Sequence, residues 1–305
     1  MMNNFIFENK TKVYFGKGGV KEYLGGLLAN FGETVMLAYG GGSIKRNGVY
    51  DGIMGILNAQ GKCVVEFSGI MSNPTYAKVQ EGAKLARENH VDLILAVGGG
   101  SVSDCCKVTS GAFDTLSHAM ETYFGKPDEN NLSDDINEAV MRSVIRNIRI
   151  LLTDPENYDA RSELAQASAM AENGVLKIGK VTDFQAHQIE HQLGAYTNCN
   201  HGAGLAVIHP VLYRHIYKSG AARFARFAQN VWGIAPKGSD EETAVAGIDA
   251  LAAFIKEIGL PTSFAELGIP ADTDFHAIAD STNVTAGCCK KLTHDEIYEI
   301  LQECL

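Results

Sequence analysis

The chain lacks the features that mark several classes of protein. No window approaches 18 consecutive apolar residues, so we expect no membrane-spanning helix. The start, residues 1–8, has neither a basic region nor an apolar stretch, so we expect no signal peptide. No basic run exceeds a pair such as Lys290-Lys291, and the formal net charge is −10. Neither nucleic acid nor an anionic membrane is therefore expected as a partner.

Paired cysteine spacing is also absent. The seven cysteines form no Cys-x-x-Cys motif, which together with their odd number predicts reduced thiols in a cytoplasmic protein. The adjacent pairs at 105–106 and 288–289 point in different directions, which argues against zinc held by thiolates. Cys199 lies close to His201 and is a candidate extra ligand, although a small side chain in a loop is the favoured interpretation.

The first hundred residues alternate between strand and helix patterns. The composition, 46% hydrophobic and 20% charged, is that of a globular protein, and 305 residues suffice for two domains. Val91–Val97 is nearly continuous apolar, as in a strand covered on both faces. The β-α-β order predicts a parallel sheet with helices on both sides. The expected strands are 33–39, 63–67 and 91–97, and the expected helices are 49–59 and 74–88.

From Gly111 onward, apolar residues recur at helical spacing and strand patterns vanish. Candidate helix starts lie at Ser133, Asp154, Ser239 and Thr293, the last resembling a capping box. The pattern predicts an α/β domain over residues 1–109 and an all-helical domain over 110–305.

Two of the expected strands end in Gly-Gly-Gly-Ser. Glycines allow backbone N–H groups to approach a pyrophosphate, and the helix that follows adds a favourable dipole. Neither turn has the Gly-x-Gly-x-x-Gly pattern, so each alone is equally consistent with a tight strand-to-helix turn. Two turns at one carboxyl edge favour dinucleotide binding. The residues are Gly40, Gly41, Gly42 and Ser43 in the first turn, and Gly98, Gly99, Gly100 and Ser101 in the second.

The residues after the first turn bear on the choice of dinucleotide. An acidic residue near the ribose is typical of NAD sites, but Ser43, Lys45 and Arg46 offer a hydroxyl and two cations suited to a 2′-phosphate. This pattern favours NADP(H) over NAD(H). The alternative is that the two cations are solvated surface residues.

Two pairs of chemistry-bearing residues repeat a spacing of four. Asp114 with His118, and His187 with His191, each lie on one face of a helix, and His201 follows just before Gly202. A single pair is often an ordinary helix ion pair or a structural histidine. Their joint occurrence predicts a divalent transition-metal site with mixed nitrogen and oxygen ligands.

Four donors would complete the metal shell, so one histidine is left over. With Asp114 and His118 supplying two ligands, His187 and His201 complete the set. His191, one turn beyond His187, then faces the open side of the metal as a candidate catalytic proton relay. Glu190 is off that face and is a candidate structural or second-layer residue.

Together these motifs resemble those of the group III, iron-containing alcohol dehydrogenases, closest to their NADPH-dependent butanol dehydrogenase branch. Residues 98–104 match the family's GGGSxxD turn, 111–121 its GxxDxxxHxxE segment, and 187–191 with 200–202 its second histidine signature. The resemblance covers nearly the whole chain. It implies an α/β N-terminal Rossmann-like domain plus an all-α C-terminal domain, with the site in the cleft.

The resemblance also implies residue roles and a reaction. By position, the metal ligands are Asp114, His118, His187 and His201, and His191 lies near the nicotinamide, while Asp104 joins the cofactor-binding residues. The implied metal is Fe²⁺, although Zn²⁺ suits the same donors. The implied reaction is hydride transfer between NAD(P)H and a short- to medium-chain aldehyde or alcohol. We expect a cytoplasmic homodimer.

One departure from the family concerns the segment before Gly111. The family carries several tens of residues there, including strands and a threonine- and glycine-rich cofactor contact, whereas here residues 107–110 run straight into Gly111. The segment is either deleted or omitted from the sequence. Omission is favoured, because removing central strands exposes core and unpaired edges.

Two other functions stay open. A polyol dehydrogenase of the glycerol type would use NAD and zinc, against which the cations after the first glycine turn argue mildly. A non-catalytic metal-binding protein is the alternative if the internal deletion is real. A metal-dependent hydrolase is disfavoured, because the chain has no His-Glu-x-x-His motif and the glycine turns would be unexplained.

Overall fold

The computed structural model describes residues 6–71, 76–98, 105–127, 129–182, 184–285 and 289–305. The chain divides into two compact units. Lys10–Ser103 form the first, called here the α/β unit, and Asp104–Leu305 with the N-terminal residues to Asn9 form the second, called the helical unit.

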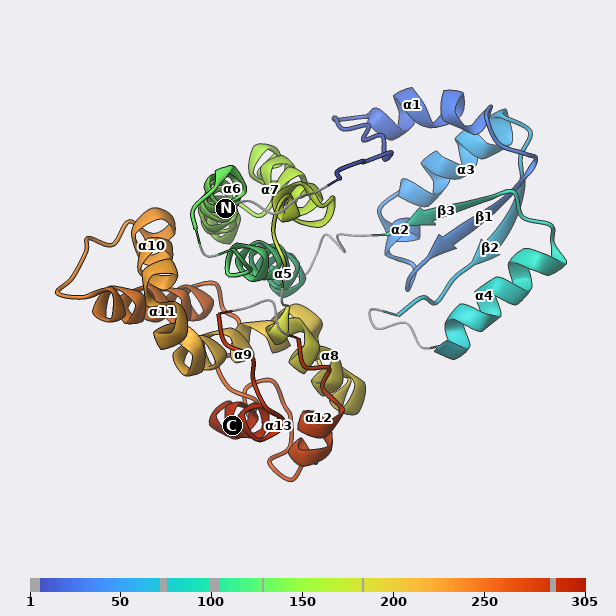
Figure 1. Cartoon of the computed structure of the whole chain (residues 1–305). Coiled ribbons are helices and arrows are strands. Elements are labelled where there is room, and N and C mark those ends of the chain that lie inside the picture. The colour runs from blue at the N-terminus through green and yellow to red at the C-terminus, as the bar shows by residue number, and fades with distance from the viewer. Residues whose placement is uncertain (1–5, 72–75, 99–104, 128, 183, 286–288) are drawn as a thin grey trace. The chain divides into compact units, whose positions relative to one another are not determined.

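The α/β unit is built on a three-stranded parallel sheet (Figure 1). Strand β1 lies between β2 and β3, with Leu37 opposite both Glu66 and Leu95. The strands are β1 (Thr34–Tyr39), β2 (Cys63–Phe67) and β3 (Leu93–Val97), and the helices are α1 (Gly19–Leu28), α2 (Ser43–Arg46), α3 (Val49–Ala59) and α4 (Tyr76–Glu88).

Helices cover both faces of this sheet, which confirms the predicted arrangement. One face packs Val35 and Leu37 against Leu57 of α3, and the other packs Phe67 against α4. The strand β3 departs from the prediction of burial on both faces, because Ile94 is 60% exposed. Helix α4 covers the β2 side of the sheet, and β3 is one of the two edge strands of the described sheet.

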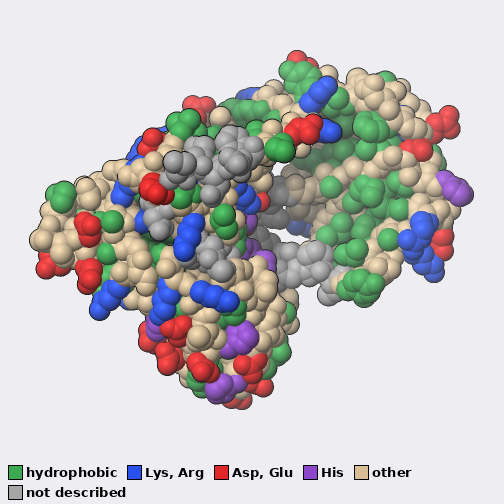
Figure 2. Space-filling model, in the orientation of Figure 1, with side chains coloured by type: hydrophobic (Ala, Val, Ile, Leu, Met, Phe, Trp, Pro, Cys, Tyr) green, Lys and Arg blue, Asp and Glu red, His purple; other side chains and the backbone are tan. Residues whose placement is uncertain are grey.

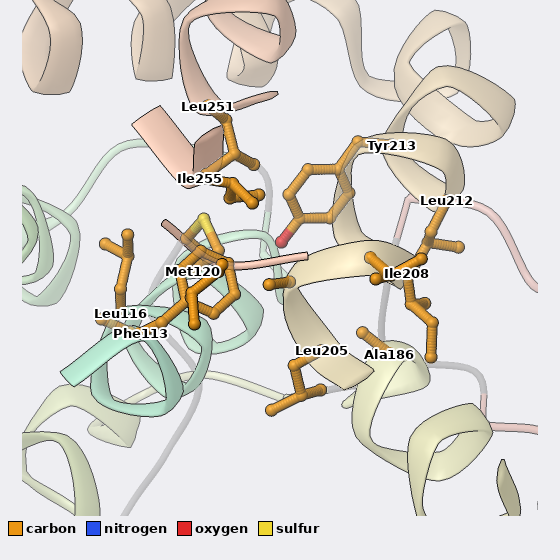
Figure 3. Packing of buried hydrophobic residues seen from close by; sticks show 14 of the residues in the cluster. Phe113, Leu116, Met120, Ala186, Leu205, Ile208, Leu212, Tyr213, Leu251 and Ile255 are labelled. Carbon is orange, nitrogen blue, oxygen red and sulfur yellow. The ribbon is translucent and has the colours of Figure 1, made fainter. Parts of the chain in front are cut away.

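The helical unit packs its helices around one continuous core. Figure 3 shows apolar side chains from α5, α8, α9 and α11 meeting at its centre, among them Phe113, Met120 and Ile208. The helices are α5 (Cys105–Tyr123), α6 (Leu132–Thr153), α7 (Tyr158–Glu172), α8 (Gln185–Thr197), α9 (His201–Ile216), α10 (Ala221–Trp232), α11 (Asp240–Glu257), α12 (Phe275–Ser281) and α13 (His294–Glu303).

Two of the four predicted helix starts are confirmed and two are shifted. Ser239 caps α11, and Thr293 forms the predicted capping box at α13. The start expected at Ser133 is wrong by two residues, because Asn131 accepts the Asp134 N–H and Asp134 completes that capping box. The start expected at Asp154 is also wrong, because Asn157 caps α7.

The surface differs between the two units. On the visible face in Figure 2, acidic and basic side chains are interspersed over the helical unit, whereas apolar side chains gather on the α/β unit. Among the residues the structure describes, no helix is both long and apolar enough to cross a membrane.

Candidate functional site

The four residues predicted as metal ligands meet in the helical unit. Asp114 and His118 lie one turn apart on α5, His187 lies in the first turn of α8, and His201 is the first residue of α9. The three helices therefore bring together residues that are far apart in sequence. His187 is buried, whereas the other three are partly exposed.

The donor atoms of these side chains are closely spaced. The Nε2 atoms of His118 and His201 each lie 3.5 Å from Asp114 Oδ1, and that of His187 lies 3.4 Å from it. The Nε2 atoms of His118 and His187 are 3.1 Å apart. Asp114 Oδ1 is buried and makes no hydrogen bond of good geometry.

This spacing fits a divalent ion. Ligand atoms at about 2.1 Å from a tetrahedral metal are separated from one another by about 3.4 Å. The four distances given above are close to this value, and the donor atoms of Asp114, His187 and His201 all lie within 4.8 Å of one another. Three imidazoles and one carboxylate are also a donor set that divalent transition metals favour. The buried, unsatisfied Asp114 oxygen would gain a partner in such an ion.

Two buried carboxylates contact the Nδ1 atoms of two of the histidines, on the side of each ring away from Asp114. Nδ1 of His187 contacts Glu121 Oε2, and Nδ1 of His201 contacts Glu190 Oε2. Each contact holds the ring with its Nε2 turned toward Asp114, the arrangement that fixes the tautomer of a metal-ligating histidine. The second-layer role predicted for Glu190 is thus supported by its position.

The charge of the cluster also suits a divalent ion. Burial opposes protonation of His187, but contacts with Asp114 and Glu121 outweigh it and raise its pKa to about 9. Burial likewise opposes protonation of His201, but Asp114 and Glu190 raise its pKa to about 10. Burial favours the neutral form of Asp114, yet the facing imidazoles hold its pKa below the usual range. A divalent ion that displaced both protons would preserve this charge.

His118 differs from the other two histidine donors. Its Nε2 lies 2.9 Å from Glu172 Oε1, a residue at the end of α7 that is about half exposed. Burial and the neighbouring His187 lower the pKa of His118 to about 4. The neutral imidazole is the form that binds metals, so His118 is ready to act as a ligand once its Nε2 leaves Glu172.

The position of His201 depends on tight packing at the start of α9. Asn200 caps this helix by accepting the Ala203 N–H, and it accepts a second bond from the Ser110 hydroxyl of α5 at 2.8 Å. A Cβ added at Gly202 would lie 2.1 Å from the Ser110 carbonyl oxygen. Only glycine therefore allows α9 to approach α5 this closely.

His191 lies beside the cluster rather than within its shell. Its ring stacks on that of His201, with centroids 5.4 Å apart, and it lies 5.8 Å from the ring of His187. The residue is exposed overall, but partial desolvation of its ring, together with the charges on His201 and His187, lowers its pKa. The role of catalytic proton relay for His191 stays a prediction.

Three further residues of the site were not assigned in the sequence. Glu121 lies seven residues after Asp114, on the same helical face, so its spacing was available as a signal. Glu172 and Phe184 gave no local signal, although the Phe184 ring lies 5.3 Å from that of His118. Cys199, the candidate extra ligand, is buried and its thiol contacts Glu190 at 3.7 Å.

The first glycine turn lies at the carboxyl end of β1. Gly40, Gly41 and Gly42 connect Tyr39 to Ser43, the first residue of α2, and Gly42 has a positive φ of 89°. Lys45, expected to be free for a phosphate, instead pairs with Glu66 of β2 at 3.2 Å. Gly98 follows β3, whereas Gly99, Gly100, Ser101 and Asp104 lie outside the described residues.

Comparison with known proteins gives matches over the whole length. The family model "Iron-containing alcohol dehydrogenase" matches residues 10–138, and "Fe-containing alcohol dehydrogenase family, C-terminal" matches residues 108–305. A probable NADH-dependent butanol dehydrogenase of Bacillus subtilis is 31% identical, with all of both chains covered. An NADPH-dependent aldehyde reductase of Escherichia coli is 27% identical over 88% of this chain and 90% of its own.

Solved structures agree with this similarity. The crystal structure of NADH-dependent butanol dehydrogenase A from Thermotoga maritima matches with a TM-score of 0.91 and 26% identity, covering 99% of each chain. The alignment with the Bacillus subtilis protein runs over 392 positions, whereas this chain has 305 residues. The relative therefore carries a substantial number of positions without a counterpart here.

Proposed function

Because the chain belongs to the iron-containing alcohol dehydrogenase family and is an oxidoreductase of that type, we propose that it interconverts a short- to medium-chain aldehyde and the corresponding primary alcohol. The substrate size is supported by relatives named as butanol dehydrogenases. The observation that carries the proposal is the convergence of three imidazole nitrogens on the buried oxygen of Asp114.

The proposed metal ligands are the four residues whose donor atoms converge. The family description supports Fe²⁺, while the donor set suits Zn²⁺ equally well. When bound, the divalent ion would supply Lewis-acid polarisation of the carbonyl oxygen. The ligands are Asp114, His118, His187 and His201.

The surrounding residues are proposed to orient the metal ligands and to transfer the proton of the reaction. Glu121 and Glu190 hold the Nδ1 sides of His187 and His201, so that each Nε2 faces the site. An imidazole nitrogen of His191 would deliver a proton to the alcohol oxygen in the reducing direction and accept it in the oxidising direction. The Phe184 ring beside His118 and His187 offers an apolar surface for the alkyl chain.

The nicotinamide dinucleotide is proposed to bind the glycine turns of the α/β unit. Relatives are named both as NADH-dependent and as NADPH-dependent enzymes, so their names do not decide the preference of this chain. The cations after the first turn favoured NADP(H). The pairing of Lys45 with Glu66 weakens that argument.

Oxidation of NADH and NADPH against a series of aldehydes tests the proposal. The protein is stripped with a chelator, reconstituted with Fe²⁺ or Zn²⁺, and assayed beside the stripped sample. We expect turnover of butanal-sized aldehydes only after reconstitution, with one metal ion per chain by elemental analysis. Equal turnover by the stripped protein would contradict the metal role, and turnover of polyols alone would favour a glycerol-type dehydrogenase.

A further inference from the structure

Four polar side chains form a cluster at the carboxyl ends of β1 and β2. The Glu66 carboxylate accepts hydrogen bonds from the hydroxyls of Tyr39 at 2.5 Å and Tyr50 at 2.6 Å. Lys45 donates to the same carboxylate at 3.2 Å, and its Nζ lies 4.4 Å from the centre of the Tyr50 ring. The Glu66 side chain is 40% exposed, so a ligand can reach a carboxylate that already holds a cation.

The cluster lies where a doubly wound sheet binds its nucleotide. Strand β1 is flanked by β2 and β3, and α3 and α4 pack on opposite faces, so the chain changes direction at the carboxyl end of β1. Dinucleotides bind at such a switch point, and an acidic residue about 20 residues beyond the first glycine turn binds the ribose 2′-hydroxyl. Glu66, near the end of β2, occupies that position after Gly40–Gly42.

Electrostatics at this edge distinguish the two dinucleotides. Hydrogen bonds with Tyr39 and Glu66 raise the pKa of Lys45, so its charge is retained and is compensated by Glu66. A 2′-phosphate brings a charge of about −1.5 to −2 and could recruit Lys45 only by taking it from Glu66, whose negative charge would then face the phosphate. A ribose hydroxyl, by contrast, can replace one tyrosine as donor to Glu66 without any change in charge.

We propose that Glu66 sets the preference of this chain toward NAD(H), by accepting a hydrogen bond from the ribose and by holding Lys45 away from a 2′-phosphate. This inference rests on the proposed function, since it takes this edge to be the dinucleotide site. Arg46, the next residue, is exposed and has no ion pair among the described residues. It is the remaining cation beside the turn through which a 2′-phosphate could still bind.

The test compares two adenosine probes by calorimetry on the full chain, 5′-AMP and adenosine 2′,5′-bisphosphate. We expect the unmodified protein to bind AMP more tightly. Glu66→Gln keeps an acceptor but removes the charge, and should shift the affinity ratio at least about tenfold toward the bisphosphate. Glu88→Gln is the matched control, because it removes an exposed carboxylate that pairs with Lys84 in α4. Its ratio should stay within about twofold of the unmodified chain.

Lys45→Gln provides the second measurement. In the unmodified background it should change bisphosphate affinity by less than about twofold, and in the Glu66→Gln background it should abolish the gain. A tenfold loss from Lys45→Gln alone, or equal ratios in Glu66→Gln and Glu88→Gln, would overturn the inference and leave the proposed function standing. Failure of both probes to bind the unmodified, metal-loaded protein would overturn the nucleotide site itself, and this inference with it.

Discussion

The helical unit buries one continuous core that extends from α5 to α13, whereas the α/β unit buries two small clusters on opposite faces of a three-stranded sheet. The metal donors belong to the helical unit, and the first glycine turn belongs to the α/β unit. Metal ligands tolerate errors of only a few tenths of an ångström, so they gain most from helices locked by a large core. Backbone contacts to a nucleotide need only the end of a strand and a turn.

Removing one metal donor should have the largest effect, because it should abolish metal binding by the helical unit and leave nucleotide binding by the α/β unit unchanged. His201→Ala deletes a ligand and leaves the buried Glu190 without its imidazole partner. We expect loss of both the bound metal and the NAD(P)H-dependent turnover, while 5′-AMP still binds the α/β unit with unchanged affinity. Elemental analysis and calorimetry measure the two effects. Full turnover by the metal-free variant would refute the role of this histidine.

Breaking a buried charge network in the helical unit should show how strongly the stability of this unit depends on its buried interior. Asp134 is fully buried, and its carboxylate pairs with Lys180 and with Arg223 at 2.8 Å. Asp134→Ala removes the carboxylate that pairs with both buried cations and should lower the unfolding free energy by about 3–5 kcal/mol in urea titrations. The control Asp135→Ala removes an exposed partner of Arg226 and should cost at most about 1 kcal/mol. Equal losses would contradict this account.

The α/β unit, which has the smaller core, should unfold independently of the helical unit when that core is weakened. Leu57 of α3 is fully buried against the sheet, and Leu57→Ala should cost about 2–5 kcal/mol. We expect the metal-loaded variant to unfold in two transitions, with the earlier one removing nucleotide binding and the later one releasing the metal. Val49→Ala, at an exposed position of the same helix, should change little. A single transition with simultaneous metal release would show that the units unfold together.

Substituting the two carboxylates that contact the Nδ1 atoms of the histidines should have the smallest effect on the metal site. Glu121→Gln and Glu190→Gln each weaken the hold on one ligand ring and should lower metal affinity about 10- to 100-fold in chelator competition. Glu172→Gln is the control. The exposed Glu172 carboxylate contacts Nε2 of His118, the atom that would bind the metal, rather than the Nδ1 side of a ring. Removing its charge should weaken this competing contact and should not lower metal affinity. A loss as large as in the other two variants would make Glu172 part of the site.

Much of the architecture follows from local patterns. The spacing of four in both helical pairs placed Asp114 beside His118 and His187 beside His191, because one helical turn aligns such residues. The expected strands and the helix at Val49–Ala59 were correct for the same reason, since periodicity reports burial. The helix start at Asn131 was missed, because Ser133 and Asp134 are themselves good capping residues.

Contacts between distant segments were not visible in the sequence. The approach of Glu172 to His118 depends on how α7 packs, and no spacing encodes it. Glu66 could not be linked to the first glycine turn from the residues beside that turn, because it lies on the neighbouring strand β2. Its pairing with Lys45 depends on the register of β1 and β2, which brings Glu66 beside Leu37. Local chemistry was therefore predictable, whereas the partner of each charged group was not.

The short connection between α8 and α9 has a consequence for how the protein folds. Only Asn198–Asn200 separate the two helices, so His187 and His201 come together through a loop that costs little entropy to close. Asp114 and His118 join them only when α5 docks across a long stretch of chain, and such distant contacts form late. We therefore expect the metal centre to be completed late in folding. An ion supplied at the start of refolding should be captured no sooner than one supplied when α5 docks.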